Sequence, residues 1–222
     1  MSTAHPLMDI YNRMLERYGQ QHWWPAETCF EVMAGAVLTQ AAAWSNVEKA
    51  IANLKAADAL SPHALRRLPL EQLAQLVYSS GYYNAKARKL KALSEYLGRR
   101  FQDDFGAMAR EETDSLRAEL TGVHGIGEET ADDILLYALG KPTFVIDSYT
   151  RRLFSRLGMA PEIQRYSTYQ GLFAANLAPD PELFGEYHAL IVRHVVDTCQ
   201  KQPLCQGCCL LEMCPTGKRN DS

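Results

Sequence analysis

The stretch LTGVHGIGEETADDI, residues 120–134, decides the fold of this chain. It places Gly122, Gly125 and Gly127 between two segments that have the apolar spacing of helices. Glycine permits positive φ angles and lets the backbone come close to another chain, and the apolar Ile126 can plug the space between the two helices. The pattern predicts two helices joined by a tight hairpin, although an ordinary glycine-capped corner between helices has similar spacing.

The second helix of this hairpin starts with unpaired backbone N–H groups, which are suited to hold a phosphate. We therefore expect Gly125, Gly127 and Thr130 to contact a DNA backbone, with Thr130 adding a hydroxyl. Contacts of this kind position a protein on DNA without reading its bases.

Outward from the hairpin, helical periodicity dominates the sequence. We expect Ser45 to cap a helix, with Glu48 completing a capping box. A further helix is expected over residues 130–139, ending at Gly140. Only residues 143–146 resemble a strand, and four residues cannot make a sheet. The sequence therefore predicts an all-α protein.

Composition bounds the class of protein. The chain has 222 residues and a net charge of −3, and no apolar run reaches the roughly 18 residues of a membrane helix. Residues 1–19 have the pattern of an amphipathic helix rather than of a signal peptide. We expect no membrane association and a cytoplasmic location.

Basic residues gather between positions 84 and 100. Such a strip suggests a surface that faces DNA, although a solvated helix face has the same composition. Against the single acid Glu95, the strip contains Lys86, Arg88, Lys89, Lys91, Arg99 and Arg100.

Cysteines cluster near the C-terminus in the pattern Cys199-x5-Cys205-x2-Cys208-x5-Cys214, and Cys209 is left over. Clustered cysteines in a cytosolic chain favour metal binding over disulfides. Four thiolates suit one four-coordinate metal centre, for which zinc is the chemical rival of an iron–sulfur cluster. A cysteine-rich tail without metal is the remaining alternative.

Three motifs occur together in one order: the hairpin, FVIDSYTRR at 144–152, and GYYNAKA at 81–87. Together they resemble the helix–hairpin–helix DNA glycosylase superfamily of the endonuclease III and MutY type, over residues 30–214. The resemblance implies a two-lobed helical fold that binds double-stranded DNA containing a damaged base. A helical barrel would span 29–142, with the hairpin at about 115–140. Residues 1–28 and 143–222 would form the second lobe.

The same resemblance assigns the chemistry. Asp147 would be the carboxylate that stabilises positive charge on the sugar as the glycosidic bond breaks, although an aspartate at this place can simply cap a helix. Bifunctional relatives carry a lysine in Gly-x-Gly-x-Lys-Thr-Ala, where this chain has Glu129. Glutamate cannot form a Schiff base, so we expect a monofunctional enzyme. Glu129 is assigned to ordering water or contacting the base, and a first-turn acid favoured by the helix dipole is the alternative.

For the cysteines, the family pattern C-x6-C-x2-C-x5-C implies a structural [4Fe–4S] cluster, held by Cys199, Cys205, Cys208 and Cys214. The first gap is one residue shorter in this chain. That difference puts in question whether Lys201 in the first loop reaches DNA.

The sequence around Trp23 and Trp24, together with FEVMAGAVLTQ at 30–40, is similar to bacterial 3-methyladenine glycosylases of the endonuclease III type. An indole face stacks well on a cationic alkylated purine, although both tryptophans would also suit a core. By family position, Gln40 and Tyr82 would fill the gap left by a flipped base.

The sequence thus favours a monomeric, nucleoid-associated, monofunctional glycosylase that acts on alkylated purines such as 3-methyladenine. A glycosylase for oxidised pyrimidines or mismatched bases is the first alternative. A DNA-binding helix–hairpin–helix protein without catalysis is the second.

Overall fold

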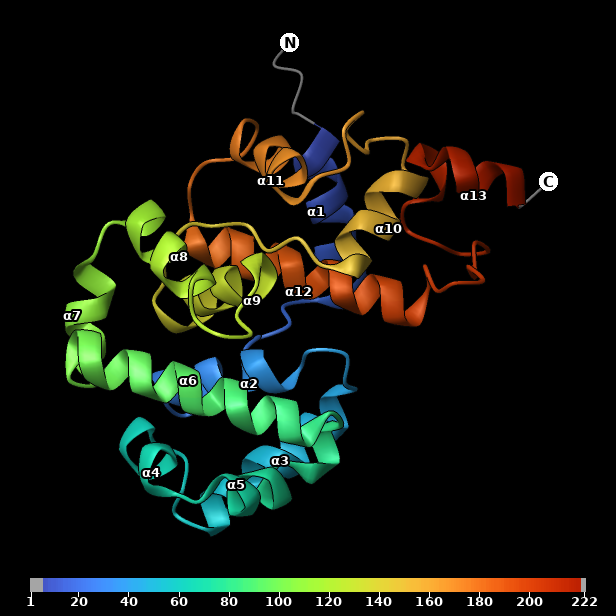
Figure 1. Cartoon of the computed structure of the whole chain (residues 1–222). Helices are drawn as coiled ribbons and strands as arrows, with labels where there is room; N and C mark the ends of the chain where they lie inside the picture. The colour runs from blue at the N-terminus through green and yellow to red at the C-terminus, as the bar shows by residue number, and fades with distance from the viewer. Residues whose placement is uncertain (1–5, 221–222) are drawn as a thin grey trace. The chain divides into compact units, whose positions relative to one another are not determined.

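The computed structural model describes residues 6–220 of the chain. Over that range the regular secondary structure consists of helices, and no strand is present (Figure 1). The prediction of an all-α protein is therefore confirmed. None of these helices is both long and apolar enough to cross a membrane.

Contacts divide the chain into two compact units: unit 1, Met1–Trp23 with Pro142–Ser222, and unit 2, Trp24–Lys141. The helices of unit 2 are α2 (Cys29–Leu38), α3 (Trp44–Ala56), α4 (Pro62–Arg67), α5 (Leu70–Leu76), η1 (Tyr78–Ser80), α6 (Tyr83–Phe101), α7 (Phe105–Arg110), α8 (Thr113–Thr121), α9 (Glu128–Asp133) and η2 (Ile134–Ala138). Those of unit 1 are α1 (Pro6–Tyr18), α10 (Ser148–Arg156), α11 (Tyr166–Ala174), α12 (Pro181–Asp197), η3 (Leu211–Met213) and α13 (Pro215–Asn220).

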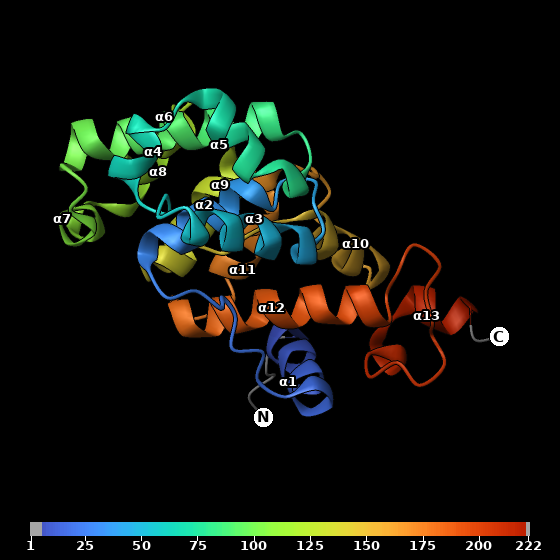
Figure 2. The same cartoon turned by 90° about the horizontal axis from the view of Figure 1, so that it is seen from below.

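Unit 2 is built around α2, whose residues from Phe30 to Leu38 are all buried. Because no face of α2 meets solvent, its sequence is apolar all round, apart from Glu31. That carboxylate pairs with Lys55 of α3 at 2.9 Å. Helices α4 and α5 lie against α6, as both views show (Figures 1 and 2).

The beginning of α3 differs from the expected one. Helix α3 starts at Trp44 with Ala43 as its N-cap, so Ser45 lies in the first turn and the expected capping box is wrong. The Trp44 ring packs edge-on against Trp24, with the ring centroids 5.4 Å apart. A serine cap contributes only about 1 kcal/mol, so the packing of a partly buried tryptophan can override it.

The second hairpin helix is also less regular than expected. In place of one helix over 130–139, α9 passes into the π-helical segment η2, which buries Ile134, Leu135 and Leu136. A π-turn widens the helix by one residue and rotates the side chains that follow. The chain leaves this segment at Gly140, whose φ of +64° suits glycine.

Unit 1 is held together by aromatic packing. The Phe144 ring stacks on Phe173 at 3.6 Å and meets Phe184 and Tyr187 edge-on. The Tyr187 hydroxyl also donates to the carbonyl oxygen of Leu7 at 2.7 Å. This bond fastens α12 to α1, which crosses it in Figure 2.

The strand-like residues 143–146 are extended but form no strand. Side chains supply the hydrogen bonds that a sheet would have supplied. The Gln170 amide donates to the Phe144 carbonyl at 3.0 Å, and the Ile146 N–H donates to the Tyr166 hydroxyl at 3.2 Å. This segment therefore enters α10 in a fixed position.

Candidate active site and DNA-binding elements

Asp147 stands at the N-cap of α10, where its side chain accepts a hydrogen bond from the Thr150 N–H at 2.7 Å. The residue is buried, and its side chain keeps 12% exposure. Burial raises the pKa of the Asp147 carboxyl, but the His188 ring and the Thr150 N–H outweigh that effect and hold the pKa below its ordinary value. A buried but ionised carboxylate is suited to stabilise a developing positive charge.

The hairpin brings Gly125, Gln40 and Lys89 together in unit 2. Gly125 has a φ of +81°, and a Cβ added there would collide with the Lys89 side chain. The Lys89 ammonium donates to the Gln40 side-chain carbonyl. On its other side, the Gln40 amide nitrogen donates to the Gly125 carbonyl at 3.2 Å and to the Thr130 hydroxyl at 2.9 Å. Gln40 is thus bonded to both sides of the hairpin turn.

Thr130 and Gly127 have different surroundings. The Thr130 side chain is buried against Gln40, with 4% of the residue exposed. A phosphate contact from its hydroxyl, as expected from the sequence, therefore does not fit this geometry. Gly127, the N-cap of α9, has no other atom within 4 Å of an added Cβ. The open space beside Gly127 leaves room for a ligand to approach the backbone.

Lys86 is the least exposed residue of the basic strip, at 1%. Its ammonium donates to the Leu38 carbonyl at 2.7 Å and to the Ser80 carbonyl at 2.6 Å. These carbonyls precede Gln40 and Tyr82 by two residues each, so one buried amine fixes the backbone of both segments. Burial lowers the pKa of Lys86 to about 8.

Tyr82 is held in an unusual backbone conformation. Its φ is +46°, in the left-handed region that few tyrosines adopt, and 75% of the residue is exposed. Strain of this kind persists only where the surrounding structure imposes it. The bonds of Lys86 to the preceding turn are part of that constraint.

The basic strip as a whole is less available for binding DNA than its composition suggested. Lys86 and Lys89 are used inside unit 2, and Lys91 donates to the Arg66 carbonyl at 3.0 Å. Arg100 pairs with Glu111 at 2.9 Å and with Glu119 at 3.1 Å. Four of the six strip residues therefore stabilise the protein itself, which corrects the interpretation of the strip as one DNA-facing surface.

The remaining predicted residues are divided between the two units. Trp24 of unit 2 packs on the core, with the Trp44 and Tyr137 ring centroids each 5.4 Å away. An added Cβ on Gly35 would lie 2.9 Å from the Trp24 ring, so glycine permits this packing. Trp23 belongs to unit 1 and is half-buried. Glu129 is exposed in the first turn of α9.

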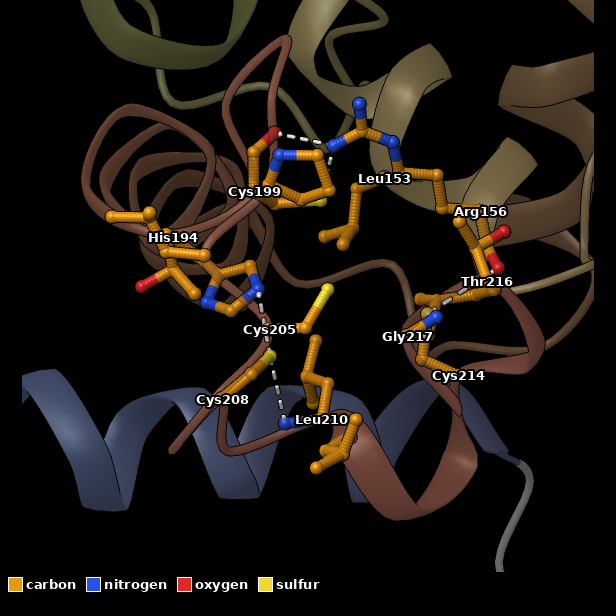
Figure 3. Close-up of a pocket in the computed structure, with 15 residues that line it drawn as sticks. Leu153, Arg156, His194, Cys199, Cys205, Cys208, Leu210, Cys214, Thr216 and Gly217 are labelled. Carbon is orange, nitrogen blue, oxygen red and sulfur yellow. Dashed lines mark hydrogen bonds between the residues drawn. The ribbon is translucent and has the colours of Figure 1, made fainter. Parts of the chain in front are cut away.

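The cysteine loop of unit 1 surrounds one pocket. Cys199, Cys205, Cys208 and Cys214 line it together with residues of α10 (Figure 3). Cys209 is absent from that lining. Among residues 6–220, no three acidic, histidine or cysteine side chains are grouped to hold a metal ion as they stand.

Hydrogen-bond donors surround the sulfur atoms of this pocket. Backbone N–H groups reach the Cys208 sulfur from Leu210 at 3.4 Å and the Cys214 sulfur from Gly217 at 3.2 Å. The Arg156 guanidinium lies 3.2 Å from the Cys199 sulfur and also donates to the carbonyl of that residue (Figure 3). Such donors stabilise negative charge on sulfur, as a thiolate-bound cluster requires.

Two thiols of the pocket, those of Cys199 and Cys208, are kept neutral by burial. Burial raises the pKa of Cys208 to about 11 and also raises that of Cys199. A metal binds thiolates and so displaces these protons. The donor set and the surrounding N–H groups therefore fit a cationic metal centre.

Comparison with known sequences decides the family. Residues 34–179 match the family described as "HhH-GPD superfamily base excision DNA repair protein". The chain belongs to this superfamily. The chain is accordingly a DNA glycosylase of base excision repair. A candidate DNA repair glycosylase of Methanocaldococcus jannaschii is 44% identical over 207 residues, which cover 92% of this chain and 94% of the relative.

Two solved structures show the same fold. A trapped endonuclease III–DNA covalent intermediate matches with a TM-score of 0.84 and 24% identity, over 100% of both chains. The H. pylori 3-methyladenine DNA glycosylase bound to 1,N6-ethenoadenine matches with a TM-score of 0.72 and 30% identity. That match covers 85% of this chain and 96% of the H. pylori protein. The expected helix–hairpin–helix glycosylase fold is thereby confirmed.

Sequence reasoning overlooked two residues that the structure joins to the site. His188 lies beside Asp147, with its Nε2 atom 3.6 Å from the Asp147 Oδ2 atom. It comes from α12, some forty residues away, and no local motif marks it. Lys89 was included in the basic strip, but its bond to Gln40 depends on the close approach that Gly125 allows.

Two of the three hairpin glycines, Gly125 and Gly127, provide a matched test of the hairpin's role. We expect Gly125→Ala to lower the free energy of unfolding by about 1–3 kcal/mol, because the positive φ and the Lys89 side chain both oppose a Cβ. Gly127→Ala should leave stability within about 0.5 kcal/mol of the parent and should weaken DNA binding. Urea denaturation and fluorescence anisotropy with duplex DNA measure the two effects. Unchanged DNA affinity in Gly127→Ala would contradict a backbone contact at this position.

Proposed function

We propose that the chain is a monofunctional DNA glycosylase in which the Asp147 carboxylate supports hydrolysis of the bond between base and sugar. The observation behind this proposal is the buried position of Asp147 at the N-cap of α10, where its surroundings hold the pKa of the carboxyl below its ordinary value. As the glycosidic bond breaks, the sugar develops positive charge at C1′, and a fixed carboxylate stabilises that charge. The electron pair of the bond leaves with the base, and water supplies the oxygen that replaces it.

The absence of a Schiff-base step follows from Glu129, since a carboxylate cannot form an imine. Glu129 is an exposed first-turn residue of α9 and belongs to unit 2, whereas Asp147 belongs to unit 1. We propose for Glu129 a contact with water or with the base. The side chain of Asp147 then remains the central catalytic group.

For the DNA, we propose that the hairpin holds a phosphate at the open space beside Gly127. Gln40 and Tyr82 would fill the gap in the duplex. The exposure and strained backbone of Tyr82 support this role. Gln40 would have to exchange its bonds to the hairpin for bonds to DNA. The expected DNA partner is a duplex with a damaged base, bound by one copy of the chain.

For the base, we propose alkylated purines, with Trp23 and Trp24 as contacts. The 30% identity with the H. pylori enzyme, which holds an ethenoadenine in its structure, supports this choice. Several endonuclease III proteins are also relatives; that of Thermotoga maritima is 29% identical over 213 residues. These relatives favour oxidised pyrimidines as the second candidate class.

We further propose that Cys199, Cys205, Cys208 and Cys214 hold a [4Fe–4S] cluster. Such a cluster would cross-link the C-terminal loop to the helices of unit 1. The N–H groups around the sulfurs and the arginine beside Cys199 support this assignment.

A panel of duplexes tests the proposed substrate class. Purified protein should release base from DNA containing 3-methyladenine or ethenoadenine at least about tenfold faster than from DNA containing thymine glycol or uracil. Borohydride added during turnover should trap no covalent adduct, because Glu129 stands at the position of the Schiff-base lysine. Faster release of thymine glycol would instead assign the chain to oxidised pyrimidines, and a trapped adduct would overturn the monofunctional mechanism.

Replacement of the carboxylate tests the mechanism itself. Asp147→Asn keeps an oxygen that can cap α10 but removes the negative charge. We expect the single-turnover rate of base release to fall about 100-fold or more, while binding to undamaged duplex stays within about twofold. Base release as fast as in the parent protein would show that Asp147 is not the catalytic carboxylate.

Metal analysis tests the cluster, with the spare cysteine as its control. The purified protein should be brown and contain about four iron atoms per chain. Cys205→Ser should lose most of the iron, and Cys209→Ser should keep it, because Cys209 is outside the lining of the pocket. One zinc atom per chain, or equal iron loss in both variants, would contradict the assignment.

A further inference from the structure

We propose that His188 is a positioning residue for Asp147, which fixes the orientation of the carboxylate within unit 1. This inference rests on the proposed catalytic role of Asp147. It concerns a residue of α12 that the hairpin and the motif around Asp147 do not include.

The two oxygens of the carboxylate have different neighbours. The Thr150 N–H donates to Oδ1 at 2.7 Å, whereas the His188 Nε2 atom lies 3.6 Å from Oδ2. A single capping bond leaves a carboxylate free to rotate about its Cβ–Cγ bond. Two neighbours on different oxygens restrict that rotation, so the carboxylate presents one direction to a sugar.

His188 is itself placed rigidly. Its side chain is 8% exposed and comes from the middle of α12, a helix of 17 residues. The neighbouring Tyr187 is buried in the aromatic cluster and bonded to the Leu7 carbonyl. These contacts fix α12 against α1, so the backbone that carries the buried imidazole is held in place beside Asp147.

His188 also affects the charge of the Asp147 carboxyl. Burial of Asp147 by itself favours the protonated, inactive carboxylic acid. The groups that oppose it are His188 from α12 and Thr150 from α10 itself, and of these His188 has the larger effect. Without the imidazole, burial would still raise the pKa of Asp147, and only Thr150 would remain to lower it. The pKa of Asp147 would then rise.

The sign of the pH effect follows from this balance. An aspartate with a lowered pKa stays ionised, and hence active, until the pH falls through that pKa. Loss of His188 moves this acidic limit upward. A group that only filled space at this position would change folding stability or the maximal rate, but would not displace the acidic limb of a pH–rate profile.

The experiment is a set of single-turnover rates of base release measured between pH 4 and pH 9 on the lesion that the panel identifies. His188→Leu removes the ring and its polar contact with the Asp147 carboxylate, and His188→Gln retains a neutral polar group. His63→Gln, at an exposed position on α4, is the matched control for loss of a histidine. Asp147→Asn is measured alongside, and thermal melting checks that each variant folds.

We expect the acidic limb of His188→Leu to move upward by about one pH unit, which lowers the rate on that limb about tenfold. His188→Gln should shift the limb by less and should retain more of the maximal rate, and His63→Gln should match the parent. If His188→Leu does not fold, the His188→Gln variant tests the proposal instead. An unmoved acidic limb of the pH–rate profile in that variant overturns the proposal.

An unmoved acidic limb in a folded His188→Leu variant, with or without a lower maximal rate, would also overturn the positioning role. In that case a slow Asp147→Asn variant would leave the proposed function of Asp147 intact. Undiminished base release by Asp147→Asn would instead remove the proposed function, and the role of His188 with it. The two failures are thus distinguished in one set of measurements.

Discussion

An ionised carboxylate inside a helical protein must be compensated, because removal of a charge from water costs several kcal/mol unless hydrogen bonds or an opposite charge replace the solvent. The compensation at Asp147 comes from one backbone N–H at the start of α10 and from the His188 imidazole. Other contacts in unit 1 hold the segments that carry Asp147 and His188. Tyr166 and Gln170 hold the extended segment before Asp147, and Tyr187 holds the helix that carries His188.

In unit 2, several short segments are held in defined positions although no sheet is present among the described residues. Helix α6 holds them through two lysines. Lys86 binds the carbonyls that precede Gln40 and Tyr82, and Lys89 binds Gln40 while its aliphatic part packs on Gly125. A cationic helix that resembles a DNA-binding surface in sequence therefore acts mainly as an internal scaffold. A buried lysine with three donors can join carbonyls from segments that are distant in the sequence.

The cysteine loop has little regular structure of its own beyond η3 and α13. Its attachment to α10 depends on Arg156, whose guanidinium donates to the carbonyls of Cys199, Gln200 and Lys201. The first cysteine gap, one residue shorter than the family pattern, is thus bound along its backbone to α10. These bonds direct the loop toward the protein's own helix, whatever contact the Lys201 side chain makes.

The sequence by itself determined the helical class and the hairpin, because each depends on spacing within a short segment, and it indicated the superfamily through three motifs in a fixed order. It did not determine the start of α3, where the packing of Trp44 overrode a serine cap. Nor did it reveal the internal use of the basic strip or the approach of His188 to Asp147. These features depend on contacts between residues far apart in the chain. Periodicity records which face of a helix is buried, but it does not record which side chain of another helix that face will meet. Only the tertiary structure determines these side-chain contacts, through the packing of α12 on α10 and of α6 on the hairpin.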